Sequence, residues 1–149
     1  MSEKSKANSV EKVDGITVYR VNLRSYLGQI FLPQNIYLVL KTLWSLGVQG
    51  GLPLKNLVKE AIKSVITAKV VSRHKCNVVS SYMAHVSLQL LVLNRHWQGK
   101  KGIILTVFGE IYEASDFMDR YRELIIRLLL IPDSVLASSC HCANSLQQI

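Results

Sequence analysis

A stretch of 49 residues between Glu60 and Glu110 contains no aspartate or glutamate. It nevertheless carries seven lysines and arginines and three histidines, which are Lys63, Lys69, Arg73, Lys75, Arg95, Lys100, Lys101, His74, His85 and His96. Like charges on a compact surface repel one another and cost stability, so a fold that gathers these cations needs an anion to offset them. We therefore expect an anionic partner for this part of the chain.

Length and composition predict one domain with a substantial core. A chain of 149 residues buries roughly two-thirds of the surface that its unfolded form exposes, which suffices for a core without metal or disulfide support. Apolar residues make up 49% and charged residues 19%, a balance that argues against a disordered chain. The net charge of +8 and the pI near 9.6 favour phosphates or an acidic surface as partner.

Cysteine usage and the N-terminus favour an intracellular location, either cytoplasmic or nucleoid-associated. Cys76, Cys140 and Cys142 form an odd set that implies no disulfide framework. Residues 1–8 are mostly polar and lack the apolar core of a secretory signal. The longest charge-free segment, 76–94, contains serine, asparagine, glutamine and histidine side chains that are costly in hydrocarbon. We therefore expect no membrane partner.

The folded domain is expected to span residues 15–132. Residues 1–14 are polar and aperiodic, and residues 133–149 follow Pro132 and are rich in serine, asparagine and glutamine. Both segments are predicted to be flexible tails. The alternation that begins at Gly15 suits a short strand.

Hydrophobic periodicity predicts three helices in the first two-thirds of the domain. Apolar residues recur at helical spacing from Pro33 to Gly47, and Gly47 is a suitable stop. A second helix starts near Pro53 and combines an apolar stripe with a lysine face. Residues 77–93 are predicted to form a third helix with small and polar side chains opposite its apolar side.

A basic hairpin is expected over residues 97–106, because Gly99 and Gly102 flank two lysines and the following residues favour a strand. A last helix is expected over 110–130, with acids at intervals of three on one edge. Its apolar stripe is predicted to pair with the same helix of a second copy. The positions expected in this dimer contact are Ile111, Met118, Tyr121, Ile125 and Leu128.

The segment Leu105-Thr106-Val107-Phe108-Gly109 resembles the returning strand of winged helix-turn-helix DNA-binding proteins, in particular small bacterial and archaeal regulators. In that family a recognition helix precedes a hairpin with glycine and lysine or arginine, and the strand closes as Leu-Thr-x-x-Gly. The resemblance spans residues 34–131. It implies a mainly α fold with a small β-hairpin, a winged helix-turn-helix with an additional C-terminal dimerisation helix.

The polar face of the predicted third helix is the candidate for base contacts. Small side chains allow a helix to approach the major groove closely, and an asparagine can pair bidentately with adenine. The alternative is an ordinary solvated helix face. The candidates are Asn77, Ser80, Ser81 and His85.

Four cations that bracket this helix are the candidates for phosphate contacts, which supply affinity and register but no sequence information. Two precede the helix and two form the expected hairpin tip, where they are alternatively ordinary solubilising residues. These cations are Arg73, Lys75, Lys100 and Lys101.

The favoured function is sequence-specific binding of double-stranded DNA by a homodimer, as a transcription regulator or a plasmid or virus maintenance factor. One alternative is a structural nucleoprotein that coats nucleic acid in many copies, and another is a module whose basic face docks an acidic protein. The chain lacks a phosphate-cradling glycine loop and a His-Glu-x-x-His motif, so no catalytic residue and no cofactor are expected. Cys140-His141-Cys142 cannot easily wrap one tetrahedral ion, so no metal site is expected.

Overall fold

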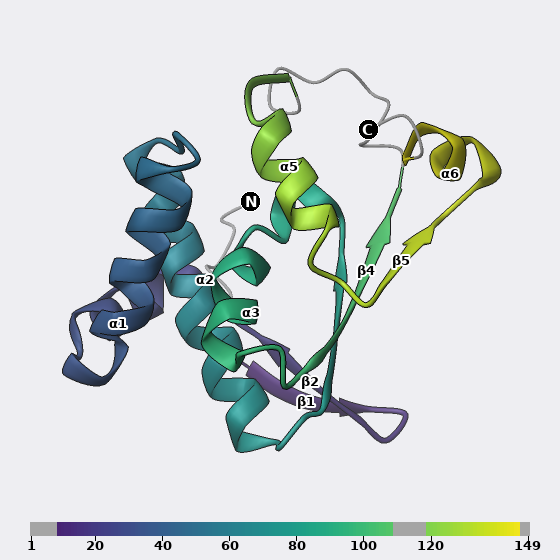
Figure 1. Ribbon diagram of the computed structural model, residues 1–149. Coiled ribbons are helices and arrows are strands. Elements are labelled where there is room, and N and C mark those ends of the chain that lie inside the picture. Colours follow the sequence, from purple (N-terminus) through teal and green to yellow (C-terminus); the bar gives the residue numbers. More distant parts are fainter. Residues whose placement is uncertain (1–8, 109–118, 147–149) are drawn as a thin grey trace, which may run out of the picture.

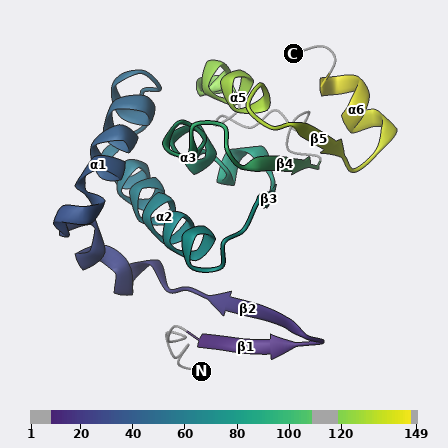
Figure 2. The same ribbon diagram turned by 60° about the horizontal axis from the view of Figure 1, so that its bottom comes forward.

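The computed structural model describes residues 9–108 and 119–146 and has a mixed α/β fold. Three parallel strands, β3 (Val78–Tyr82), β4 (Gly102–Val107) and β5 (Ser134–Ala137), form one sheet in the order β3-β4-β5. The connections contain α3 (Gln89–Trp97) and α5 (Arg122–Leu129), which contact one another on the same side of the sheet (Figures 1 and 2).

Side chains along each strand point alternately to the two faces of the sheet, one of which is covered and the other open. In β4, Ile103, Leu105 and Val107 are almost completely buried in the hydrophobic core, whereas the residues between them are half-buried. On the open face, Tyr82 and Leu136 are more than half exposed, in one row of the register on either side of β4. Parallel sheets are usually covered on both faces, so the open face here is unusual.

A helical layer packs beside α3. It consists of α1 (Pro33–Thr42), its π-helical continuation η2 (Leu43–Val48), and the long α2 (Leu54–Arg73) that runs antiparallel to α1 (Figure 1). Helix α2 begins after Pro53, which fixes an extended backbone before the first turn. The 3-10 segment η1 (Leu23–Phe31) packs against α2.

The chain begins with an antiparallel hairpin and ends with a short helix. Strands β1 (Ser9–Val13) and β2 (Ile16–Arg20) join through Asp14 and Gly15, which both have positive φ, as a two-residue hairpin turn requires. Helix α6 (Cys140–Leu146) follows β5.

The two long helices expected near Pro33 and Pro53 are confirmed, and so is a strand from Ile16. Both expected tails contain ordered elements instead, because 9–13 pairs with β2 and 134–146 forms β5 and α6.

The third helix predicted over residues 77–93 is wrong in its first half. Val78 to Tyr82 form β3, a short 3-10 turn follows, and the helix starts only at Gln89. β-branched and aromatic residues favour a strand, and the apolar periodicity spanned two different elements. The expected hairpin at 97–106 is also absent, because β4 pairs in parallel with β3 and β5. A central strand of a parallel sheet does not match the wing of a winged helix.

Candidate nucleic-acid interface

The parallel sheet brings two basic segments of the chain together where β3 and β4 begin. Val78 pairs in register with Gly102, and the Gly102 amide donates a 2.9 Å hydrogen bond to the carbonyl of Asn77. Because the two strands are parallel, the segments that precede them lie at the same end of the sheet, where β3 and β4 begin. We call the cations on these two segments the basic edge, which comprises Arg73, Lys75, Lys100 and Lys101.

Left-handed backbone conformations at the ends of α2 and α3 turn both basic segments toward the sheet. Helix α2 ends at Arg73, and Lys75 has φ +51°, the left-handed conformation in which helices commonly stop. Gln98 (φ +54°) and Gly99 (φ +69°) turn the chain from α3 into β4 in the same way. Left-handed backbone costs an ordinary side chain roughly 1–2 kcal/mol, so glycine is the usual residue at such a stop and Lys75 and Gln98 are exceptions.

The basic edge is exposed and has no acidic partner among the residues that the structure describes. Three of its side chains are exposed and Lys101 is half-buried. The ion pairs found between described residues join Arg20 to Glu11 and Lys63 to Glu60, and neither pair includes a residue of this edge. No ion pair between described residues engages these four cations, although the Asp133 carboxylate lies at the start of β4, where it accepts a 2.8 Å hydrogen bond from the Ile103 amide.

Stabilisation of helix ends accounts for only some of the cations near the basic edge. Arg73 lies in the last turn of α2 and Arg95 in the last turn of α3, where a cation stabilises the partial negative charge of the helix end. The other three cations, Lys75, Lys100 and Lys101, lie outside the helices. They therefore do not stabilise a helix end from within its last turn.

The remaining cations of the acid-free stretch do not all join this edge. Lys63 binds Glu60, and Lys69 donates a hydrogen bond to Gln29 of η1. Burial, and then the charge of Lys41, lower the pKa of His96, so this histidine adds no positive charge at neutral pH. The cations that share the edge are thus a subset of those counted in the sequence.

The base-contact candidates do not form one face of a recognition helix, which corrects the expectation for them. Asn77 precedes β3 and is exposed, while Ser80 points to the open face of the sheet. Ser81 points inward, and its hydroxyl lies 2.7 Å from that of Ser87. His85 lies in the turn after β3. A strand and its following turn cannot enter the major groove as a helix does.

The predicted dimer contact on the last helix is also wrong for the residues that the structure describes. Tyr121, Ile125 and Leu128 are 7%, 1% and 0% exposed and belong to the chain's own hydrophobic core. Their side chains are therefore not available to a second copy. Ile111 and Met118 lie outside the described residues.

An exposed apolar stripe runs instead along α1 and η2. Ile36, Leu40, Trp44 and Val48 follow one another at intervals of four and are 45–70% exposed, and Tyr37 beside them is 57% exposed. The opposite side of the same helix is buried against the protein. A helix that is apolar all round is normally buried. The buried side of this helix includes the polar residues Asn35, Thr42 and Ser45, so its apolar residues are not confined to the core side.

A buried ion pair braces the turn after β3. Glu60 of α2 is 5% exposed and accepts a 2.7 Å hydrogen bond from Lys63 Nζ, which also donates to the carbonyl of Val86. Gln89, with its amide nitrogen turned toward both acceptors, donates to Glu60 and Val86. Burial raises the pKa of Glu60, and the charge of Lys63 lowers it in part. Because each group is paired, we assign this cluster a structural role.

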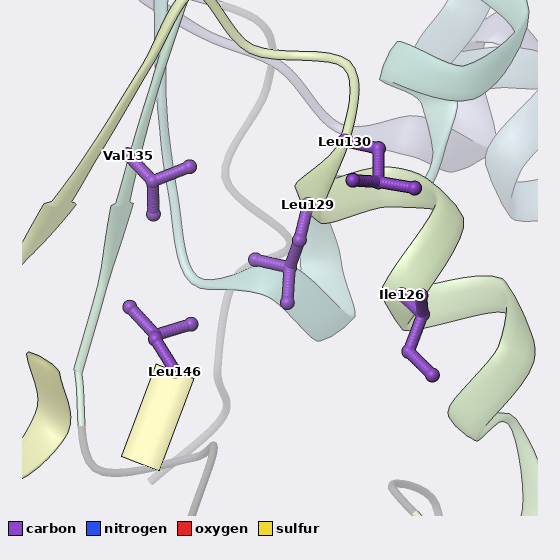
Figure 3. Close-up of a pocket in the computed structure, with 5 residues that line it drawn as sticks. All are labelled: Ile126, Leu129, Leu130, Val135 and Leu146. Atoms are coloured by element: carbon purple, nitrogen blue, oxygen red, sulfur yellow. The ribbon is translucent and has the colours of Figure 1, made fainter. Parts of the chain in front are cut away.

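An apolar pocket of about 300 Å³ lies between α5, β5 and α6 (Figure 3). None of the described lining residues has a polar side chain that could orient a substrate, so this part of the pocket does not resemble a site for a polar ligand. The lining residues are Ile126, Leu129, Leu130, Val135 and Leu146.

The cysteines at the C-terminal end do not form a metal centre in the described part of the chain. Cys142 is buried, and its thiol donates a hydrogen bond to the carbonyl of Phe108, while Cys140 is exposed. No group of three potential ligands that could hold a metal ion occurs among the described residues. Within the same residues, no helix has the length and apolarity that crossing a bilayer requires.

Comparisons with protein-family models, curated proteins and solved structures give no match to this chain.

Proposed function

We propose that this chain binds the phosphate backbone of double-stranded DNA through the basic edge, without reading base sequence. The hydrogen bond from the Gly102 amide to the Asn77 carbonyl carries the proposal, because it joins two basic segments at one end of the sheet. Lys75 and Lys101 come from different segments and have no carboxylate partner among the described residues. Phosphate contacts of this kind supply affinity and register.

The placement of the base-contact candidates favours sequence-neutral binding over specific regulation. Sequence is read when a helix or a β-ribbon presents several side chains to base edges. Here Asn77, Ser80 and Ser81 lie on an extended segment, and the Ser81 hydroxyl is engaged with Ser87. A nucleoprotein that coats DNA in many copies needs no such readout. Between the two DNA-binding candidates, we therefore favour the structural nucleoprotein.

Self-association of this nucleoprotein is assigned to the apolar stripe of α1 and η2. The stripe is the same on every copy, so two copies can bury it against each other in a symmetric contact. Lys41 is the single charged residue in 33–48, which makes the surface self-compatible. Its exposed side chains amount to on the order of 500 Å² per copy, a large part of the about 800 Å² per partner in a standard interface.

The proposal is tested by fluorescence anisotropy of a labelled random duplex titrated with the protein over a series of salt concentrations. If all four cations of the basic edge contact phosphates, the logarithm of the binding constant falls with log salt at a slope of about −3.6. Two duplexes of unrelated sequence should bind with affinities within about threefold of each other. A slope near zero, or strong preference for one duplex, contradicts the proposal.

A further inference from the structure

A second basic site lies at the other end of α2, where η1 packs across the helix and leaves a pocket of about 460 Å³. Asn22 caps η1 by accepting a hydrogen bond from the Arg24 amide, and Lys69 binds Gln29 farther along η1. The first of these bonds orders the start of η1, and the second ties its far end to α2. The pocket is lined by Val21, Asn22, Leu23, Arg24, Leu27, Lys55, Val58, Lys59 and Ile62.

The floor of this pocket is apolar. Ile62 is 3% exposed and Val58 is half-buried on the α2 side, and Leu23 and Leu27 face them from η1. A volume of this size lies within the range of small-molecule sites, which are mostly apolar with a few polar groups that fix orientation.

Among the described residues of the lining, every charged group is positive. Arg24, Lys55 and Lys59 are exposed, and none of the described lining residues is a carboxylate. Lys55 and Lys59 are four residues apart on α2, a spacing at which like charges repel. An anion between them offsets this repulsion.

We propose that this pocket binds an amphipathic anion, an aliphatic chain of medium length with a carboxylate or phosphate head. The chain lies on Val58 and Ile62, and the head lies between Lys55 and Lys59 with Arg24 opposite. We assign the ligand to the free monomeric acid, because the apolar residues line a pocket of about 460 Å³, a volume in the range of small-molecule sites.

The pocket is separate from the basic edge. Lys59 and Arg73 lie on the same helix, and a rise of 1.5 Å per residue places them about 21 Å apart along its axis. Charge-reversal variants can therefore distinguish the two sites. The double variant Lys55→Glu/Lys59→Glu alters the pocket, and Lys75→Glu/Lys101→Glu alters the edge by the same net charge.

The experiment titrates octanoate, below its micelle concentration, into isotopically labelled protein and follows backbone amides and methyl groups by NMR. Saturable shifts should centre on Val58, Lys59 and Ile62. Lys55→Glu/Lys59→Glu should weaken binding by about tenfold or more, and Lys75→Glu/Lys101→Glu should change it by less than about twofold. Octyl phosphate should bind at the same place, and octylammonium should not.

Three results would overturn the assignment. The first is equal binding of octylammonium and octanoate, which would make the pocket a nonspecific apolar surface. The second is equal weakening by both double variants, which would reflect net charge alone. The third is sedimentation with phosphatidylglycerol vesicles, lost in Lys55→Glu/Lys59→Glu, without octanoate binding, which would make the ligand a lipid surface. Loss of DNA binding leaves these outcomes unaffected, so the two sites are tested separately.

Discussion

The amide of Gly102, the first residue of β4, donates a hydrogen bond to the carbonyl of Asn77, which immediately precedes β3. This hydrogen bond belongs to the Val78–Gly102 pair at the start of the parallel ladder and holds together the two loops that enter the sheet. Both loops carry lysines that have no carboxylate partner among the described residues. The basic edge is thus a product of parallel pairing, since an antiparallel hairpin would have placed its lysines at an isolated tip.

Leu128→Ala should lower the free energy of unfolding by about 2–5 kcal/mol, because Leu128 is completely buried and the substitution leaves a cavity. The loss should be independent of protein concentration, since the side chain packs within its own chain. Urea unfolding at two protein concentrations measures both quantities. A loss that increases on dilution would place Leu128 in a subunit contact and contradict the core assignment.

Leu40→Lys/Trp44→Lys should convert a self-associated protein into a monomer without unfolding it, because both side chains are 59% exposed and lie at the centre of the apolar stripe. Sedimentation velocity gives the mass in solution. Leu136→Lys is the matched control, since Leu136 is 52% exposed on the open face of the sheet. If the control dissociates the protein and the stripe variant does not, the self-association surface lies on the sheet.

The raised pKa of Glu60 predicts that the free energy of unfolding depends on pH in mildly acid solution. Burial raises its folded-state pKa above the ordinary 4.5, although Lys63 opposes the shift. A group with a raised folded-state pKa contributes stability below its unfolded pKa and loses that contribution as the pH rises through the folded-state value. The wild-type chain should therefore lose stability relative to Glu60→Gln as the pH rises from below 4.5 through this window.

Urea unfolding of both proteins at a series of pH values, from about 3.5 to about 7, checks this expectation. The difference in unfolding free energy between them should change across the acid range and become constant at higher pH. A difference that is constant throughout would show that the pKa of Glu60 is the same in the folded and unfolded chain.

The sequence correctly predicted those elements in which the apolar pattern lies within a single helix or strand. Helices after Pro33 and Pro53 have a continuous helical stripe, and their starts follow from proline geometry. Ile103 to Leu105 were correctly expected in a strand. The partner of that strand could not be deduced, because alternation shows that one face is buried but does not distinguish a hairpin from a parallel crossover.

The candidate site was predicted in part. The four cations of the basic edge were identified from the missing acids, and parallel pairing explains why their segments meet. The Ser80 and Ser81 prediction failed because helical periodicity was extended across a strand, a turn and a helix. The dimer contact expected at Tyr121, Ile125 and Leu128 failed because a helix with a 3-4 stripe can pack within its own chain as well as against a second copy, and here these side chains share one hydrophobic core with residues of β4 and α3.

The salt dependence of DNA binding in two charge-matched variants tests the central claim most directly. Lys75→Glu/Lys101→Glu should weaken binding to every duplex and reduce the magnitude of the log–log salt slope by about 2, one unit for each lost phosphate contact. Lys55→Glu/Lys59→Glu changes net charge equally and should retain the wild-type slope. Equal slopes in the two variants would show that the basic edge has no special role and would contradict the account.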